Sequence, residues 1–126
     1  MEMMSITVAG RELPMGFDLR AWVNELEPKF GSLTQMSERL NGQDKPITAG
    51  IDMLTMVVNA GARINGSKEK ISREWLIDNI KPAEVAAFIG MGQMAIMASF
   101  RQENADAEEP VDEVLAEIEK KDAADA

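Results

Sequence analysis

The sequence of 126 residues contains neither cysteine nor histidine. Without cysteine the chain can form no disulfide and offers no thiolate nucleophile, and without both residues it cannot build a Cys/His zinc site. Histidine is also the most common general base near neutral pH, so an enzyme with this sequence would depend on carboxylates, Lys, Ser or Thr alone. We therefore expect a protein that is not an enzyme and that needs no cofactor or metal.

Signals for export, for membrane insertion and for nucleic-acid binding are also missing. Residues 1–5 lack a basic segment followed by an apolar one, which favours a cytoplasmic location. The most apolar stretch, residues 85–100, is shorter than the ~18–20 residues that a bilayer span requires. A sequence pI near 4.5 argues against binding to a phosphate backbone. We expect neither a membrane nor a nucleic acid among the partners.

Negative charge is concentrated at the C-terminal end of the chain. Residues 101–126 hold ten Asp or Glu against three Lys or Arg and so carry −7 of the net charge of −9. This shift in composition predicts a helical body over residues 1–102 and an acidic, largely disordered tail over residues 103–126. Within the tail, Val111, Val114, Leu115 and Ile118 recur with helical spacing after Pro110. They predict an amphipathic helix over residues 111–121 that is too short to be stable unless it docks.

The body has the pattern of a mainly α fold, in which a short N-terminal β-hairpin precedes a compact bundle of about five helices. The hairpin is expected over residues 5–14, with Gly10 in its turn. Helix periodicity, caps and breakers predict helices over residues 19–27, 33–40, 46–64, 73–79 and 83–102. Their starts are marked by Asp18, Ser32, Pro46, Ser72 and Pro82.

Two of these helices carry more specific expectations. In the first, Leu19, Trp22, Val23 and Leu26 share an apolar side, and Pro28 and Gly31 are expected to end the helix after Glu27. The third, residues 46–64, is apolar on most sides and has one narrow polar stripe of Asp52, Thr55, Asn59 and Arg63. Such a helix lies in the centre of the core or is shared with another subunit.

Methionines recur at every third position on the two most apolar helices. Met91, Met94 and Met97 are followed by Phe100 on the last helix, and Met53 and Met56 lie on the central one. The spacing fits gap-filling core packing, and it also fits an adaptable apolar surface for a changing partner. Gly90 and Gly92 would allow another helix to approach closely. The candidate partner-binding residues are Met91, Met94, Met97, Phe100, Met53, Met56, Val111, Val114, Leu115 and Ile118.

The order of the elements resembles a known family. Residues 10–14 (Gly-Arg-Glu-Leu-Pro) lead into residues 17–22 (Phe-Asp-Leu-Arg-Ala-Trp), and residues 30–33 (Phe-Gly-Ser-Leu) precede a small helix, a long apolar helix and an Ala/Met-rich helix with an acidic tail. Over about residues 5–100, this order resembles the tail assembly chaperones of long-tailed, siphovirus-type bacteriophages.

The resemblance implies a non-catalytic helical protein that keeps the tape-measure protein soluble and presents it to polymerising tail tube subunits. It implies the host cytoplasm as the location and absence from the mature virion. Many such phages make a longer form by a programmed ribosomal frameshift, and Glu119-Lys120-Lys121 is compatible with an A-rich slippery run. Self-association is expected as well.

Two other classes of protein remain open from the sequence. An acidic inhibitor or nucleic-acid mimic should carry its charges on a folded face, whereas here they gather in the tail. A generic acidic helical scaffold or oligomerisation module would use the same apolar helices between subunits. A scaffold holds a fixed oligomer, whereas a chaperone should exchange self-contacts for its client.

Overall fold

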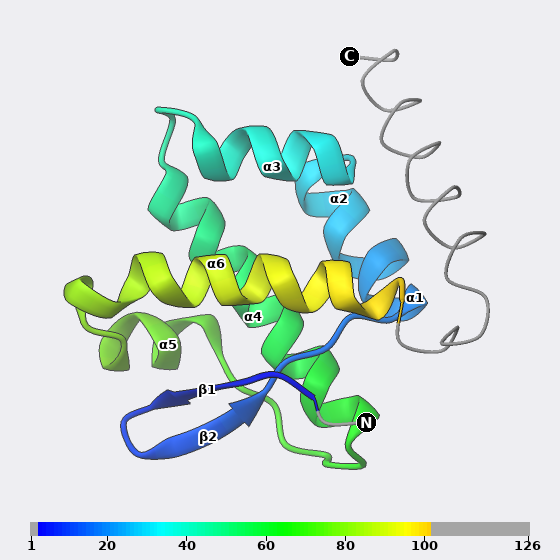
Figure 1. Ribbon diagram of the computed structural model, residues 1–126, viewed down its shortest axis with the longest axis vertical. Helices are drawn as coiled ribbons and strands as arrows, with labels where there is room; N and C mark the ends of the chain where they lie inside the picture. The colour runs from blue at the N-terminus through cyan, green and yellow to red at the C-terminus, as the bar shows by residue number, and fades with distance from the viewer. Residues whose placement is uncertain (1–2, 102–126) are drawn as a thin grey trace.

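Helix α4 (Pro46–Ile64) runs through the centre of the molecule, and the other elements pack around it (Figure 1). The computed structural model describes residues 3–101. Ten residues of α4 are buried, and most of them are aliphatic or methionine side chains that remove apolar surface from water. The prediction of a central core helix over residues 46–64 is confirmed. So is the mainly α fold with an N-terminal hairpin, within the described residues.

Strands β1 (Ser5–Val8) and β2 (Arg11–Pro14) form the predicted antiparallel hairpin. Ala9 and Gly10 both have positive φ, 51° and 80°, as a two-residue turn matched to the strand twist requires. The strands bury the side chains of Ile6, Val8 and Leu13 against the core.

The chain after β2 docks on α4. The amide of Gly16 donates to the carbonyl of Val57 at 3.0 Å. A Cβ at Gly61 would collide with the carbonyl oxygen of Pro14, so this glycine permits the close approach. The hairpin is thereby joined to the central helix instead of standing alone, which in water would leave it marginally stable.

The first helical segment begins as expected and continues further than expected. It consists of α1 (Leu19–Ala21), a π-helical turn η1 (Trp22–Leu26) and α2 (Glu27–Phe30). Asp18 caps it by accepting a hydrogen bond from the amide of Ala21 at 2.9 Å. The predicted end at Glu27 is wrong, because the helix continues through Pro28 to Phe30. Gly31, the other residue expected to end the helix, is its C-cap and has a φ of 94°. The wider π turn just before the proline accommodates a residue that cannot donate a backbone hydrogen bond.

The π turn also changes which side chains face the core. Leu26 is fully buried and Trp22 is partly buried, but Leu19 and Val23 are 71% and 51% exposed. The expectation that these four residues share one apolar side is therefore wrong for Leu19 and Val23. An extra residue in one turn rotates the following residues relative to an ideal helix, so a pattern with a period of 3.6 no longer describes the segment.

The remaining helices follow local signals in the sequence. They are α3 (Leu33–Asn41), α5 (Arg73–Asn79) and α6 (Pro82–Ser99). Ser32 and Ser72 act as N-caps, and each side chain accepts a hydrogen bond at 3.0 Å from the amide three residues later. Together with the continuous α1–η1–α2 segment and α4, they make the predicted five helices within residues 3–101. Helix α6 ends at Ser99, earlier than the expected residue 102.

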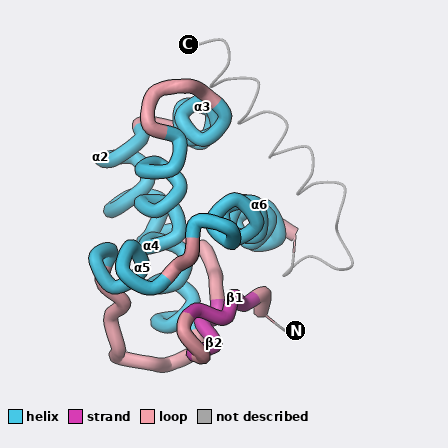
Figure 2. The backbone as a smooth tube through the Cα atoms, turned by 90° about the vertical axis from the view of Figure 1, so that its left-hand side faces the viewer, coloured by secondary structure: helices cyan, strands magenta, loops and turns pink. Residues whose placement is uncertain are grey.

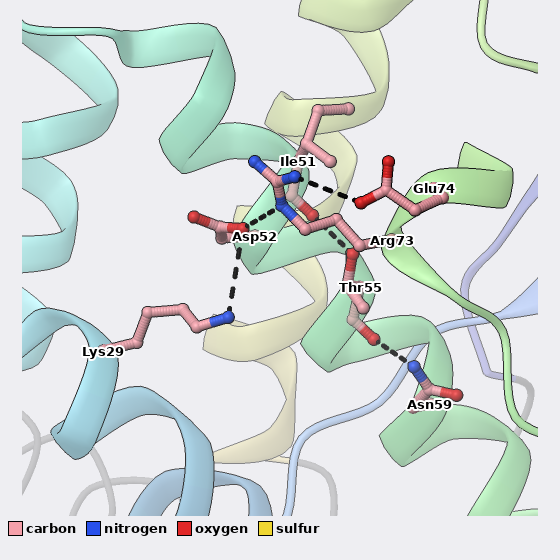
Figure 3. Close-up of polar contacts among 7 residues, drawn as sticks. All are labelled: Lys29, Ile51, Asp52, Thr55, Asn59, Arg73 and Glu74. Carbon is pink, nitrogen blue, oxygen red and sulfur yellow. Dashed lines mark hydrogen bonds and ion pairs between the residues drawn. The ribbon is translucent and has the colours of Figure 1, made fainter. Parts of the chain in front are cut away.

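The polar stripe of α4 joins the surrounding elements at both of its ends. Near the start of the helix, the Asp52 carboxylate accepts a hydrogen bond from Nε of Arg73 at 2.6 Å, and Nζ of Lys29 lies 3.9 Å from the same oxygen (Figure 3). Asp52 raises the pKa of Arg73 above its ordinary value, first through this hydrogen bond and then through its negative charge. One carboxylate thereby connects α2 and α5 to α4.

Further along α4, the stripe holds the chain before α5 and the start of α1. Asn59 pairs with the backbone of Ile71 in both directions: its Nδ2 donates to the carbonyl at 2.8 Å, and its Oδ1 accepts from the amide at 2.7 Å. Arg63 donates to the carboxylate of Asp18, the cap of α1, at 2.8 Å. The stripe is therefore fully used in structural contacts.

Replacing Asn59 by alanine should destabilise the fold by about 2 kcal/mol, because the amide and carbonyl of Ile71 lose their partner in a partly buried place. The free energy of unfolding in urea measures the effect. Thr55→Ala is the matched control, since Thr55 lies one turn earlier and its hydroxyl donates only to the carbonyl of Ile51 in the same helix. Equal losses in the two variants would contradict the role given to Asn59.

Candidate partner-binding surfaces

Helix α6 buries one side against α4. Ile89, Gly92, Ala95 and Ile96 are its buried residues. A Cβ at Gly92 would lie 2.8 Å from Cε of Met53, which is closer than real contacts allow. The expectation that Gly92 serves close helix approach therefore has a concrete basis, and the approaching helix is α4 of the same chain.

The opposite side of α6 is apolar and faces solvent. We define the outer face of α6 as Ala83, Ala86, Ala87, Gly90, Met94, Met97 and Ala98. Five of these residues are exposed, and Gly90 and Met97 are partly exposed. A Cβ at Gly90 would meet no heavy atom within 4 Å. Figure 2 views α6 nearly end-on and shows it on the outside of the helices around α4. No charged residue occurs between residues 85 and 100, so this face combines exposure with low polarity.

The candidate methionines do not form one surface. Met94 is 61% exposed on the outer face, Met97 is partly exposed beside it, and Met91 packs partly against the core. A step of three residues turns an α-helix by about 300°, so each residue of the row lies about 60° behind the last. The row from Met91 to Phe100 therefore winds about halfway round α6.

The methionines of α4 belong to the core. Met53 and Met56 are buried, and the thioether of Met53 lies under α6 against Gly92. In this fold neither side chain offers surface to a partner, so the structure removes both from the candidate set. Their role is the core packing that the spacing also fitted.

Phe100 holds the end of α6 against the N-terminal helical segment. Its ring lies 5.3 Å from that of Trp22 in an edge-to-face arrangement and 6.3 Å from that of Phe17, which is itself 5.7 Å from Trp22. Such aromatic contacts stabilise beyond the area they bury. Phe100 therefore has a structural role at the point where the acidic tail begins. The tail candidates Val111, Val114, Leu115 and Ile118 lie outside the described residues.

Two apolar grooves adjoin α6. The α3–α6 groove has a volume of about 370 Å³ and lies next to the outer face, with which it shares Met97. It is lined by Leu33, Thr34, Met36, Ser37, Glu38, Gln93, Ile96 and Met97. The α5 groove has a volume of about 520 Å³ and lies at the other end of α6. It is lined by Ile47, Thr48, Ile51, Arg73, Leu76, Ile77, Ile80, Pro82 and Val85.

The α5 groove is a surface that sequence reasoning missed. Ile47 and Ile77 are 49% and 44% exposed along it. One signal was present: α5 carries Trp75, Leu76 and Ile77 in succession, and three consecutive residues of a helix cannot all face the core. At least one large apolar side chain of α5 therefore had to lie at its edge or on its surface.

The structure brings together no group of three or more acidic side chains that could hold a metal ion within residues 3–101. Over the same residues, none of the helices has the length and apolar character needed to cross a bilayer. The Asp52 carboxylate is paired with Arg73 and Lys29.

Replacing Phe100 by alanine should destabilise the fold by about 2 kcal/mol, because two ring contacts and their buried area are lost. Urea unfolding followed by the fluorescence of Trp22, in a Trp75→Phe background, measures it. Met94→Ala in the same background is the control and should change the free energy of unfolding by less than about 0.5 kcal/mol. If the two variants are equally stable, Phe100 does not hold the end of α6.

The position of these surfaces can be set beside what is known of other proteins. Comparisons with protein-family models, with curated proteins and with solved structures found no match to this chain. The features of the molecule that bear on function are the exposed outer face of α6, the grooves beside it and the order of the elements along the sequence.

Proposed function

We propose that this protein is a non-catalytic tail assembly chaperone of a long-tailed bacteriophage. It holds the tape-measure protein in soluble form and presents it to tail tube subunits in the host cytoplasm, without remaining in the mature virion. The outer face of α6 is the observation that carries the proposal, because it is exposed, apolar and free of charge along most of the helix. The order of elements, which resembles that family, supports it.

A tape-measure protein is long and apolar along helical stripes, so its holder needs a surface that accepts such stripes. The outer face offers small residues that let a helix come close, together with Met94, whose flexible thioether adapts to different neighbours. Helix α6 has 18 residues and is about 27 Å long, which suits a helical client better than a compact groove does. The charge of −7 in residues 101–126 would keep the complex soluble.

A second candidate is a scaffold in which the outer face pairs with another copy of the chain. The same small residues favour it, since two such faces could also pack closely. The two candidate functions predict different effects of a client on the oligomer. A chaperone exchanges self-contacts for its client, so its oligomer shrinks or changes when a tape-measure segment is added, whereas a scaffold keeps its size in gel filtration.

Met94→Lys should reduce co-purification with the tape-measure protein by about tenfold or more, because binding would bury an unpaired charge. Met94 is exposed, so helicity by far-UV circular dichroism should not change. Ile77→Lys is the matched control: it places the same charge on an exposed apolar residue of the α5 groove and should leave binding intact. If Met94→Lys binds fully and Ile77→Lys loses binding, the client site is the α5 groove. Full binding by both would contradict an apolar client site on either surface.

A longer form should be made from the native gene. An immunoblot with antibody to the body, on cells that carry the gene with its natural downstream DNA, should show a minor, larger band. Silent recoding of the codons for Glu119, Lys120 and Lys121 should remove that band, because the slippery run would be lost. A larger band that survives recoding would place its origin elsewhere.

A further inference from the structure

The outer face of α6 is open to solvent among the described residues, except at Met97, which also lines the α3–α6 groove. It runs from Ala83 to Ala98, and Gly90 in its middle leaves open space where a side chain of another segment would fit. Exposed apolar surface of this extent is typical of a binding site. The question is what occupies it when no client is present.

We propose that residues 111–121 of the same chain form a helix that docks antiparallel on the outer face of α6. The described structure ends at Arg101, directly after α6, and 25 residues follow it. The nine residues 102–110 connect Arg101 to Val111 and reach at most about 30 Å when extended. Packed helix axes lie about 8–10 Å apart, so this connection is long enough to return the chain alongside α6.

The apolar pattern of residues 111–121 is complementary to the outer face of α6. In a helix over residues 111–121, Val111, Val114, Leu115 and Ile118 would share one side, and Asp112, Glu113 and Glu117 would lie away from it. Large branched side chains on the tail would meet small residues on α6, and large-against-small pairing lets layers interdigitate. A helix over residues 111–121 is about 16 Å long, which covers α6 from Ala98 through Met94 to about Ala87.

Charge and tethering favour this occupant further. Residues 85–100 of α6 carry no acid that would repel the tail. Asp112 and Glu113 fall in the first turn of the tail helix, where negative charge is favourable, and Pro110 fits its start. A short tether gives an effective concentration of about the millimolar range, so docking can occur although the isolated helix is too short to be stable.

The consequence for regulation depends on the proposed function. A docked tail would shield the outer face from solvent, and a client with a longer apolar stripe would have to displace it. The tail would then act as a resident competitor that is released when the tape-measure protein arrives.

Disulfide trapping in the full-length protein tests the docking without any client. The chain has no cysteine, so a Met94→Cys/Leu115→Cys variant contains a single pair. We expect a disulfide within the monomer, seen as faster migration on a non-reducing gel at monomeric mass. Ile77→Cys/Leu115→Cys is the matched control, because Ile77 is exposed at the other end of α6, within reach of a freely moving tail. It should form its disulfide about tenfold more slowly.

Four results would overturn the docking. Equal rates of disulfide formation for the two cysteine pairs would mean that the tail moves freely. Faster formation by the Ile77→Cys/Leu115→Cys pair would place the tail in the α5 groove. A disulfide that forms only between chains would make a second copy of the chain the occupant. Adding Val114→Asp and Ile118→Asp to the Met94→Cys/Leu115→Cys variant should slow its disulfide about tenfold, and an unchanged rate would also contradict docking through these residues. Met94 and Ile77 are exposed, and the tail positions are not among the residues of the described core.

A separate binding experiment tests whether the tail competes with the client for the outer face. Without the engineered cysteines, Val114→Asp/Ile118→Asp should bind a tape-measure segment several-fold more tightly than the natural chain, because no tail has to be displaced. Equal affinities would overturn the competition. Failure of both proteins to bind would count against the proposed function, while the disulfide result would still decide the docking.

Discussion

The packing of α4 is the constraint on which the rest of this structure depends. Its apolar residues are buried on most sides, so every other element must supply a surface that covers them. Its four polar residues occupy the remaining stripe, and three of them bond to neighbouring elements, while Thr55 donates to the carbonyl of Ile51 within α4. Asp52 binds Arg73 and Lys29, Asn59 binds the backbone of Ile71, and Arg63 binds the cap of α1. Because partly buried polar groups are costly when unpaired, the stripe fixes how α2, α5 and α1 are placed around α4.

The outer face of α6 follows from the same constraint. Helix α6 approaches α4 through Gly92 and buries Ile89, Ala95 and Ile96, while the Phe100 ring fixes its C-terminal end. These contacts use one side of the helix, yet only Gln93 and Ser99 are polar among residues 85–100. The surplus apolar surface serves no contact within the described part of the chain, which is why we assign it to binding. The two occupants that we propose, client and tail, share the property of an apolar helical stripe.

Local signals explain which parts of the fold were predictable. The bounds of α4 and α5, the hairpin turn at Gly10 and the caps at Asp18, Ser32 and Ser72 depend on residues close in sequence, and all are confirmed. The fate of Leu19 and Val23 depends on a π turn that periodicity with one fixed period cannot detect. The methionines at every third position of α6 do not share one face, because a spacing of three residues winds round a helix. Predicting the α5 groove from the sequence requires the relative placement of α4, α5 and α6, which no single segment of the sequence determines.

The central claim is that the outer face of α6 binds a client while the core beneath it remains unchanged. Methyl NMR of the methionines tests this most directly, because the chain has ten of them and they lie both on the outer face and in the core. On addition of a tape-measure segment, the methyl signals of Met94 and Met97 should shift while those of Met53 and Met56 stay in place. Binding without a shift at Met94, or with equal shifts at Met53 and Met56, would contradict it.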